Sequence, residues 1–172
     1  MPNNRKHVVS CATALCVMLL AAAAGSAEQN AGAQAAARNM SDMKFGQLPG
    51  LPACAPGSVQ SGDPGTGPSV ILAKTTAGCT IPWHWHTPNE HVMMVAGAAT
   101  VQMKDGQPVS LGAGGFALMP SHHVHQFRCG KRPCVLYVYS DAVFDIHYVD
   151  AQGNELAPDQ AFKAAKEPRK RK

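Results

Sequence analysis

The sequence predicts an all-β fold, a sandwich or barrel of short strands, and three observations support this prediction. Short runs rich in β-branched and aromatic residues recur between residues 70 and 149. Turn-forming residues separate these runs at 104–106, 112–114 and 130–133. The composition, with 45% hydrophobic residues, 16 Gly and 13 Pro among 172 residues, suits one compact, turn-rich domain.

The expected strands follow each other closely after a segment rich in Pro and Gly. That segment, residues 45–68, contains Gly62-Asp63-Pro64-Gly65, which is typical of a turn. Alternation in Val124-His125-Gln126-Phe127 places one set of side chains inward and the other outward. Helix is expected only at 158–166, as a short turn or two. The expected strands are residues 70–73, 90–96, 99–103, 115–119, 124–128, 135–139 and 145–149.

The first 27 residues have the order of a secretory signal peptide. Arg5 and Lys6 precede an apolar run, which ends in Gly25-Ser26-Ala27. The run is shorter than the ~20 residues of a membrane-spanning helix. We therefore expect cleavage after Ala27, no membrane span, and a periplasmic or secreted protein. Lipidation at Cys11 is the less favoured alternative, because Cys11 precedes the apolar run.

Composition divides the rest of the chain into three segments. Residues 28–44 predict a flexible leader, residues 45–150 the folded domain, and residues 151–172 a basic C-terminal tail. The formal net charge of +4 comes from the two ends of the chain, since the segment between them is mildly acidic. A terminal run of cations is usually solvated, and export argues against a nucleic-acid partner.

Four cysteines remain after removal of the signal peptide, an even number that fits an oxidising compartment. Cys129 and Cys134 flank an expected β-hairpin, where cross-strand neighbours can form a disulfide. Cys54 and Cys79 would then form the other pair. Four cysteines allow three pairings, and free, buried thiols are a further alternative.

Three histidines and a glutamate form a candidate metal site. His84 and His86 are two residues apart in an extended segment, so both imidazoles project from the same face. Glu90 follows after a turn, and His125 comes from a distant strand. Three imidazole nitrogens and a carboxylate suit one divalent transition metal: iron, manganese, zinc, copper or nickel. The alternative is a set of polar residues satisfied by hydrogen bonds.

Residues next to this set have less certain roles. His122 and His123 lie just before His125, where they could assist catalysis or simply occupy an exposed turn. Trp83 and Trp85 flank His84 and should face away from the metal, which favours packing or a dimer surface.

The spacing of these residues resembles the two motifs of the cupin family. Gly78, His84, His86, Glu90 and Gly97 match every fixed position of the first motif. Gly114, Pro120 and His125 resemble the second motif. Two positions depart from it, because His122 stands where a glycine is usual and Cys129 where an asparagine is usual. A histidine tolerates a left-handed backbone less well than glycine, so the turn at His122 is in question.

Membership of this family would imply a double-stranded β-helix, a jelly-roll barrel that holds the metal inside. It also implies frequent dimerisation through the sheets, so a homodimer is one expected assembly. The runs from Pro82 to Val92 and from Phe144 to Val149 resemble a group of small bacterial cupins, many with export signals.

We expect a metalloenzyme that acts on a small molecule, with dioxygenase-type chemistry as the leading class. Glu90 would act as a base, and His122 or His123 would shuttle protons. A periplasmic binding module, whose ion holds a ligand or senses a metal, is the alternative. A purely structural metal is a third interpretation, because this scaffold hosts many unrelated functions.

Overall fold

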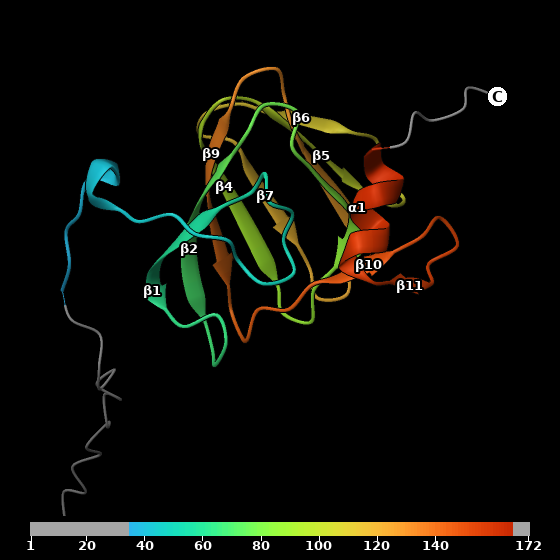
Figure 1. Cartoon of the computed structure of the whole chain (residues 1–172), viewed down its shortest axis with the longest axis horizontal. Helices are drawn as coiled ribbons and strands as arrows, with labels where there is room; N and C mark the ends of the chain where they lie inside the picture. The colour runs from blue at the N-terminus through green and yellow to red at the C-terminus, as the bar shows by residue number, and fades with distance from the viewer. Residues whose placement is uncertain (1–34, 167–172) are drawn as a thin grey trace, which may run out of the picture. The chain divides into compact units, whose positions relative to one another are not determined.

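The computed structural model describes residues 35–166, which form two antiparallel sheets and a C-terminal helix (Figure 1). One sheet has the strand order β1 (Gly57–Gly62), β2 (Ser69–Thr75), β9 (Cys134–Ser140), β4 (Glu90–Ala96) and β7 (Phe116–Met119). The other has the order β11 (Glu155–Leu156), β10 (His147–Val149), β3 (Thr80–Trp85), β8 (His125–Cys129), β5 (Ala99–Met103) and β6 (Val109–Leu111). A 3-10 helix, η1 (Met40–Asp42), precedes the strands, and α1 (Pro158–Lys166) follows them.

The two sheets form a jelly roll because the chain passes repeatedly from one to the other. From β2 to β5 successive strands alternate between the sheets, and they do so again from β6 to β10. Alternating side chains face the core, as on β4, where Val92 and Met94 are buried and Met93 and Val95 are exposed. The prediction of an all-β, double-stranded β-helix with a short C-terminal helix is confirmed.

Strands overlap each of the seven runs for which the sequence predicts one, and four further strands, β1, β3, β6 and β11, lie elsewhere. β3 occupies the segment that was expected to be extended around His84. β1 lies within the segment that looked like Pro- and Gly-rich coil, and β6 and β11 are only three and two residues long. β1 is polar apart from Val59 and pairs with β2 at the sheet edge, so its sequence lacks the apolar alternation of a strand. β11 and α1 follow residue 150 and pack on the domain, since Ala161 is buried and the Phe162 ring lies 5.2 Å from that of Tyr148.

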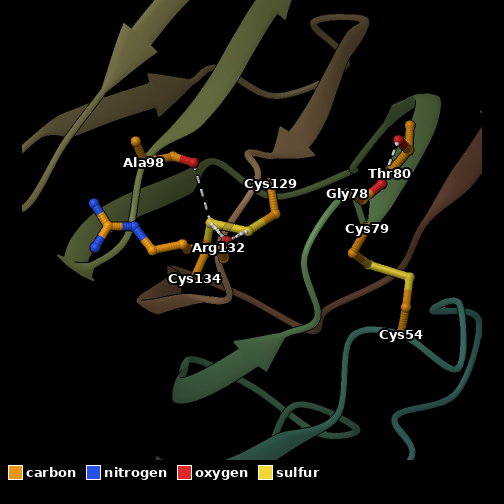
Figure 2. The surroundings of a disulfide bond; sticks show 8 residues. All are labelled: Cys54, Gly78, Cys79, Thr80, Ala98, Cys129, Arg132 and Cys134. Carbon is orange, nitrogen blue, oxygen red and sulfur yellow. Dashed lines mark hydrogen bonds between the residues drawn. A yellow bond between two sulfur atoms is a disulfide. The ribbon is translucent and has the colours of Figure 1, made fainter.

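Two disulfides link Cys54 to Cys79 and Cys129 to Cys134 (Figure 2). The first joins the segment before β1 to the turn before β3, and the second bridges the turn between β8 and β9. Of the three pairings that the sequence allows, the structure selects this one. It suits an oxidising compartment. The expected β-hairpin between Cys129 and Cys134 is wrong, because β8 and β9 belong to different sheets and do not pair.

The predicted signal peptide, residues 1–27, lies outside the described residues, as do residues 28–34 of the leader and 167–172 of the tail. Within residues 35–166, no helix is long and apolar enough to span a membrane.

Candidate metal centre

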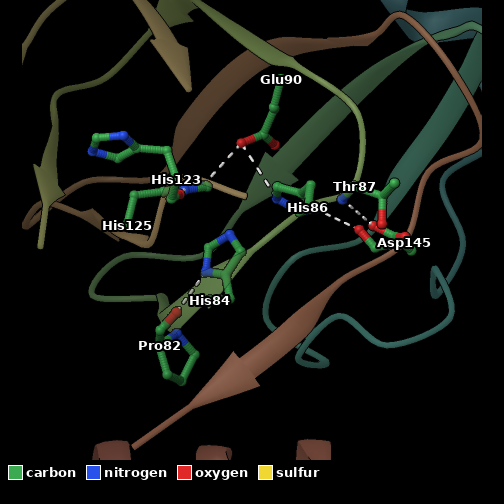
Figure 3. A network of polar contacts seen from close by, with 8 residues as sticks. All are labelled: Pro82, His84, His86, Thr87, Glu90, His123, His125 and Asp145. Carbon is green, nitrogen blue, oxygen red and sulfur yellow. Dashed lines mark hydrogen bonds and ion pairs between the residues drawn. The ribbon is translucent and has the colours of Figure 1, made fainter. Parts of the chain in front are cut away.

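The four side chains of the predicted metal site meet inside the barrel. His84 lies on β3 and His86 directly after it, while Glu90 and His125 are the first residues of β4 and β8 (Figure 3). All four are buried, and each offers a ligand atom within 4.8 Å of the other three. The cluster therefore combines residues from both sheets. His84 and His125 lie on the six-stranded sheet and His86 in the turn after β3, whereas Glu90 lies on the five-stranded sheet.

A bulge in β3 brings His84 to the inner face. Ile81 pairs with Phe127 and His84 with His125, so that Pro82 and Trp83 together face one residue of β8. Without the extra residue, Ile81 and His84 would point to opposite faces of the sheet. With it, Ile81 packs against the hydrophobic core and His84 lies beside His125 in the metal centre.

Backbone carbonyls orient the three imidazole rings. The Nδ1 atom of His84 lies 2.6 Å from the carbonyl oxygen of Pro82, and that of His125 lies 2.8 Å from that of His123. The Nδ1 atom of His86 is hydrogen-bonded to the carbonyl oxygen of Asp145. A carbonyl only accepts hydrogen bonds, so each Nδ1 is the donor, which leaves the Nε2 atom of each ring free of a proton when the ring is neutral.

The carboxylate of Glu90 faces two of these rings. Its Oε2 atom lies 3.1 Å from Nε2 of His125 and 3.5 Å from Nε2 of His86. Burial works to raise the pKa of Glu90, but His86 and His125 hold it well below its usual value. The glutamate is therefore an anion inside the barrel, with its charge directed at the imidazoles.

The pKa values of His84 and His86 are shifted in opposite directions. Burial, helped by the neighbouring His125 and His86, holds the pKa of His84 well below its usual value, so this ring is neutral. Burial also works to lower the pKa of His86, but the charge of Glu90 and the hydrogen bond to the carbonyl of Asp145 raise the pKa overall. In the metal-free protein, His86 and Glu90 therefore resemble an ion pair.

The donor set fits a divalent transition metal. Nε2 of His86 is buried and has no hydrogen-bond partner among the described residues, an arrangement that is costly unless the atom binds something. Histidines that bind metals usually donate their other ring N–H to a carbonyl or carboxylate, as all three do here. The cluster could therefore hold one ion through three nitrogens and one carboxylate, a set that suits borderline-soft metals.

Comparison with known proteins agrees with this geometry. A family model described as a cupin domain matches residues 72–140, which contain all four side chains. The chain carries a cupin domain. The resemblance seen in its motifs is thus confirmed. A search of the curated proteins found no match.

Solved structures share the cupin fold at low sequence identity. The polyketide cyclase RemF from Streptomyces resistomycificus superposes with a TM-score of 0.62 at 14% identity, over 76% of this chain and 94% of that one. The DMSP lyase DddQ from Ruegeria pomeroyi gives 0.51 at 23% identity, and an RmlC-like cupin from Shewanella frigidimarina gives 0.51 at 16%. These matches cover 59% and 60% of this chain, with 57% of the lyase and 87% of the RmlC-like cupin. At such identities they show the fold alone.

The segment after β9 supports the candidate metal centre and was not predicted to do so. Besides the carbonyl that binds His86, Asp145 provides a carboxylate that accepts the N–H of Thr87 at 2.7 Å. The ring of Phe144 lies 4.8 Å from that of His86. Fifty-nine residues separate Asp145 from His86, so spacing offered no signal, although residues 144–149 belong to a run that resembles small bacterial cupins.

The structure does not bring His122 and His123 into the cluster. The ring of His122 stacks on Trp85, 4.6 Å away, and its Nδ1 atom lies 2.7 Å from the hydroxyl oxygen of Ser121. His123 is exposed and contributes its backbone carbonyl to His125. Backbone contacts therefore connect both residues to the metal centre, because the N–H of His122 also binds the carbonyl of His86.

A small cavity of about 40 Å³ lies against the cluster. Its walls include His84, His86 and Glu90, and the rest of the lining is almost entirely apolar. Leu48 and Leu51 line it from the segment before β1, and Phe144 and Ile146 line it from the segment after β9. Since one buried water needs roughly 10–15 Å³, the cavity has room for only a few small molecules.

Proposed function

We propose that this chain is an exported, metal-binding cupin that acts on a small molecule, with dioxygenase-type chemistry as the leading class. One observation carries the proposal: three oriented imidazoles and an anionic carboxylate converge, buried, and two of these imidazoles and the carboxylate line a small apolar cavity. Chemistry placed at such a wall is shielded from bulk water. The two disulfides are in keeping with export.

One divalent metal, iron, manganese, zinc, copper or nickel, would be held by His84, His86, Glu90 and His125. It would supply Lewis-acid chemistry and, as iron or manganese, redox chemistry. The protein's own contribution is to keep the Nε2 atoms directed inward, since carbonyls hold each Nδ1. Rings held in this way need little rearrangement when they bind an ion.

The cavity supports dioxygen chemistry in particular. Dioxygen is small and apolar, and the cavity is both small and lined mainly by apolar side chains such as Leu48, Leu51 and Ile146. A larger organic substrate could enter only if the segment containing Leu48 and Leu51 moved. We therefore propose that the reaction joins dioxygen with a substrate that approaches past this segment.

Glu90 is the proposed base. It is the one carboxylate that lines the cavity, and it is ionised. His122 and His123 do not line the cavity, so a proton-shuttle role for them would depend on water or on movement of the loop. We place the proton transfer on Glu90 for this reason.

A non-catalytic binding module is the second candidate. The observation that favours it is the small volume of the cavity, about 40 Å³, which leaves little room for a substrate. In that case the metal would stabilise the fold, or the protein would act as a metal sensor, and it would catalyse no reaction.

Oxygen uptake distinguishes the two candidates. The protein is loaded anaerobically with iron or manganese and mixed with oxygen and a panel of small phenols, thiols and 1,3-diketones. We expect substrate-dependent oxygen consumption that His86→Ala abolishes, whereas His91→Ala retains it because His91 lies on the outer face of β4. Stoichiometric metal without oxygen consumption for any substrate or metal would instead favour the binding module.

A further inference from the structure

A second cleft, separate from the metal centre, lies on the outer face of the six-stranded sheet. It measures about 1050 Å³, far more than the internal cavity. Strands β3, β8 and β5 form its floor, α1 lines one side and Pro108, in the turn between β5 and β6, also lines it. None of the four side chains of the metal centre lines it. We refer to it as the outer cleft.

The floor of the outer cleft is polar and ordered in rows by the sheet register. Arg128 on β8 pairs with Thr80 on β3 and with Thr100 on β5, which makes one row across three strands. In the next row Gln126 pairs with Gln102, and the Nε2 atom of Gln126 donates to Oε1 of Gln102 at 2.9 Å. The Nε2 atom of Gln102 in turn donates to the carbonyl of Gly106 at 3.2 Å, and each amide retains further hydrogen-bonding capacity. The three floor strands together span about 10 Å, which is wide enough for one extended ligand chain.

Aromatic and small apolar residues line the outer cleft beside these rows. Trp83 is half-buried, and Phe162, Ala161 and Ala165 come from α1. The bulge in β3 places Trp83 here, on the outside, while His84 points inward. A ligand in this cleft would therefore meet a hydrogen-bonding floor and an apolar wall at once.

The charge of the outer cleft is positive. Arg128 and Lys166 line it, and neither has a carboxylate within 4.0 Å among residues 35–166. Asp150 also lines it, but its carboxylate accepts hydrogen bonds from the N–H groups of Gln152 and Asn154 and from the Asn154 amide. A guanidinium with no carboxylate partner in this part of the chain, beside hydroxyls and amides, is suited to a carboxylate on the ligand.

We propose that the outer cleft binds an acidic oligosaccharide. A sugar ring offers an apolar C–H face to Trp83, hydroxyls to the Thr and Gln rows, and, as a uronate, a carboxylate to Arg128. The floor strands are interior to the sheet and their backbone groups are already paired, so an extended peptide cannot add here as a further strand. Recognition must come from side chains, which suits a ligand rich in hydroxyl groups.

Calorimetric titration of the full chain with hexagalacturonate tests this proposal, with the methyl-esterified hexamer as the uncharged counterpart. We expect the acid to bind at least tenfold more tightly than the ester. Arg128→Gln should lower affinity for the acid to that for the ester, and Trp83→Ala should weaken both about tenfold, whereas Trp83→Tyr retains part of the binding. Arg132→Gln, which removes a cation from the turn between β8 and β9 outside the cleft, should change nothing.

Three results would overturn the proposal. They are no binding at millimolar oligosaccharide, equal losses in Arg128→Gln and Arg132→Gln, and self-association that Trp83→Ala abolishes, which would assign the cleft to a second copy of the chain. His86→Ala should bind the acid as well as the unmodified chain does. The outcome is therefore independent of whether the metal centre has the proposed function.

Discussion

The carbonyl oxygen of Asp145 accepts a hydrogen bond from Nδ1 of His86, 59 residues earlier in the sequence. The same residue binds the N–H of Thr87 through its carboxylate, which also lies 3.4 Å from His147. Partial burial works to raise the pKa of Asp145, but the hydrogen bonds of Thr87 and the nearby His147 hold it below its usual value. Asp145 thus anchors the turn that carries His86.

Removing the Asp145 carboxylate should loosen the metal centre without removing a ligand. We expect Asp145→Ala to weaken metal binding by about 10- to 100-fold, because the turn that carries His86 loses its hydrogen bond at the Thr87 N–H. Asp145→Asn keeps an acceptor for the Thr87 N–H and should lose less. Competition with a chelating dye measures the affinity, and Asp105→Ala, in an exposed turn, is the control. Equal affinities for all four proteins would refute this role.

Metal affinity should rise with pH through neutrality. The raised pKa of His86 means that the ring keeps its proton above 6.5 in the metal-free protein, and an incoming metal must displace it. We expect affinity to increase by up to about tenfold per pH unit until the pH passes that raised pKa. Titrations between pH 6 and 9 test this, and a flat profile would contradict it.

The proton on His86 also stabilises the metal-free fold, and this contribution is larger at low pH than at high pH. Because the folded pKa of His86 exceeds the unfolded value of 6.5, its contribution is complete below pH 6.5 and disappears as the pH rises through the folded pKa. Glu90→Gln removes the charge that raises this pKa, so it should flatten the dependence. Urea denaturation of the metal-free protein at several pH values gives the comparison.

The two disulfides should differ in what they contribute to stability. Cys54–Cys79 joins residues 25 apart and Cys129–Cys134 residues only 5 apart. Chain-entropy estimates give about 3.5 kcal/mol for the longer loop and about 2 kcal/mol for the shorter one. Paired Cys→Ser variants, compared by urea denaturation, should show the larger loss for Cys54 and Cys79. The reverse order would mean that chain entropy does not govern either bond.

His122 has a positive φ of 59°, which no other non-glycine residue among residues 35–166 shares. His122→Gly removes the steric cost of this conformation, whereas His122→Ala keeps it, and both lose the stacking on Trp85. We therefore expect the glycine variant to be more stable than the alanine variant by about 1 kcal/mol. Equal free energies of unfolding would show that the backbone at His122 is not strained.

Much of the fold could be predicted because the apolar side chains of its strands alternate. In β4, Val92 and Met94 face the core in the order that the sequence indicates. β1 was missed because an edge strand needs few apolar residues, and its Ser and Gln side chains gave no period. The turn at His122 was in question because a histidine stands where glycine is usual, and the histidine adopts the left-handed conformation nonetheless.

The candidate metal centre was predictable in its members but not in its surroundings. Residue types and spacing pointed to His84, His86, Glu90 and His125, which the fold brings together. Counting along β3 could not reveal the bulge at Pro82 and Trp83, because a bulge is a property of two paired strands. The contact between Asp145 and His86 depends in the same way on tertiary structure alone.

Elemental analysis of the mature protein, purified from its native compartment without added metal, tests the metal centre most directly. We expect one transition-metal ion per chain, lost in His86→Ala and retained in His91→Ala, with both variants folded by circular dichroism. A folded wild-type protein that contains no metal and takes up none on addition, or a His86→Ala variant with the same metal content, would contradict metal binding by these four side chains.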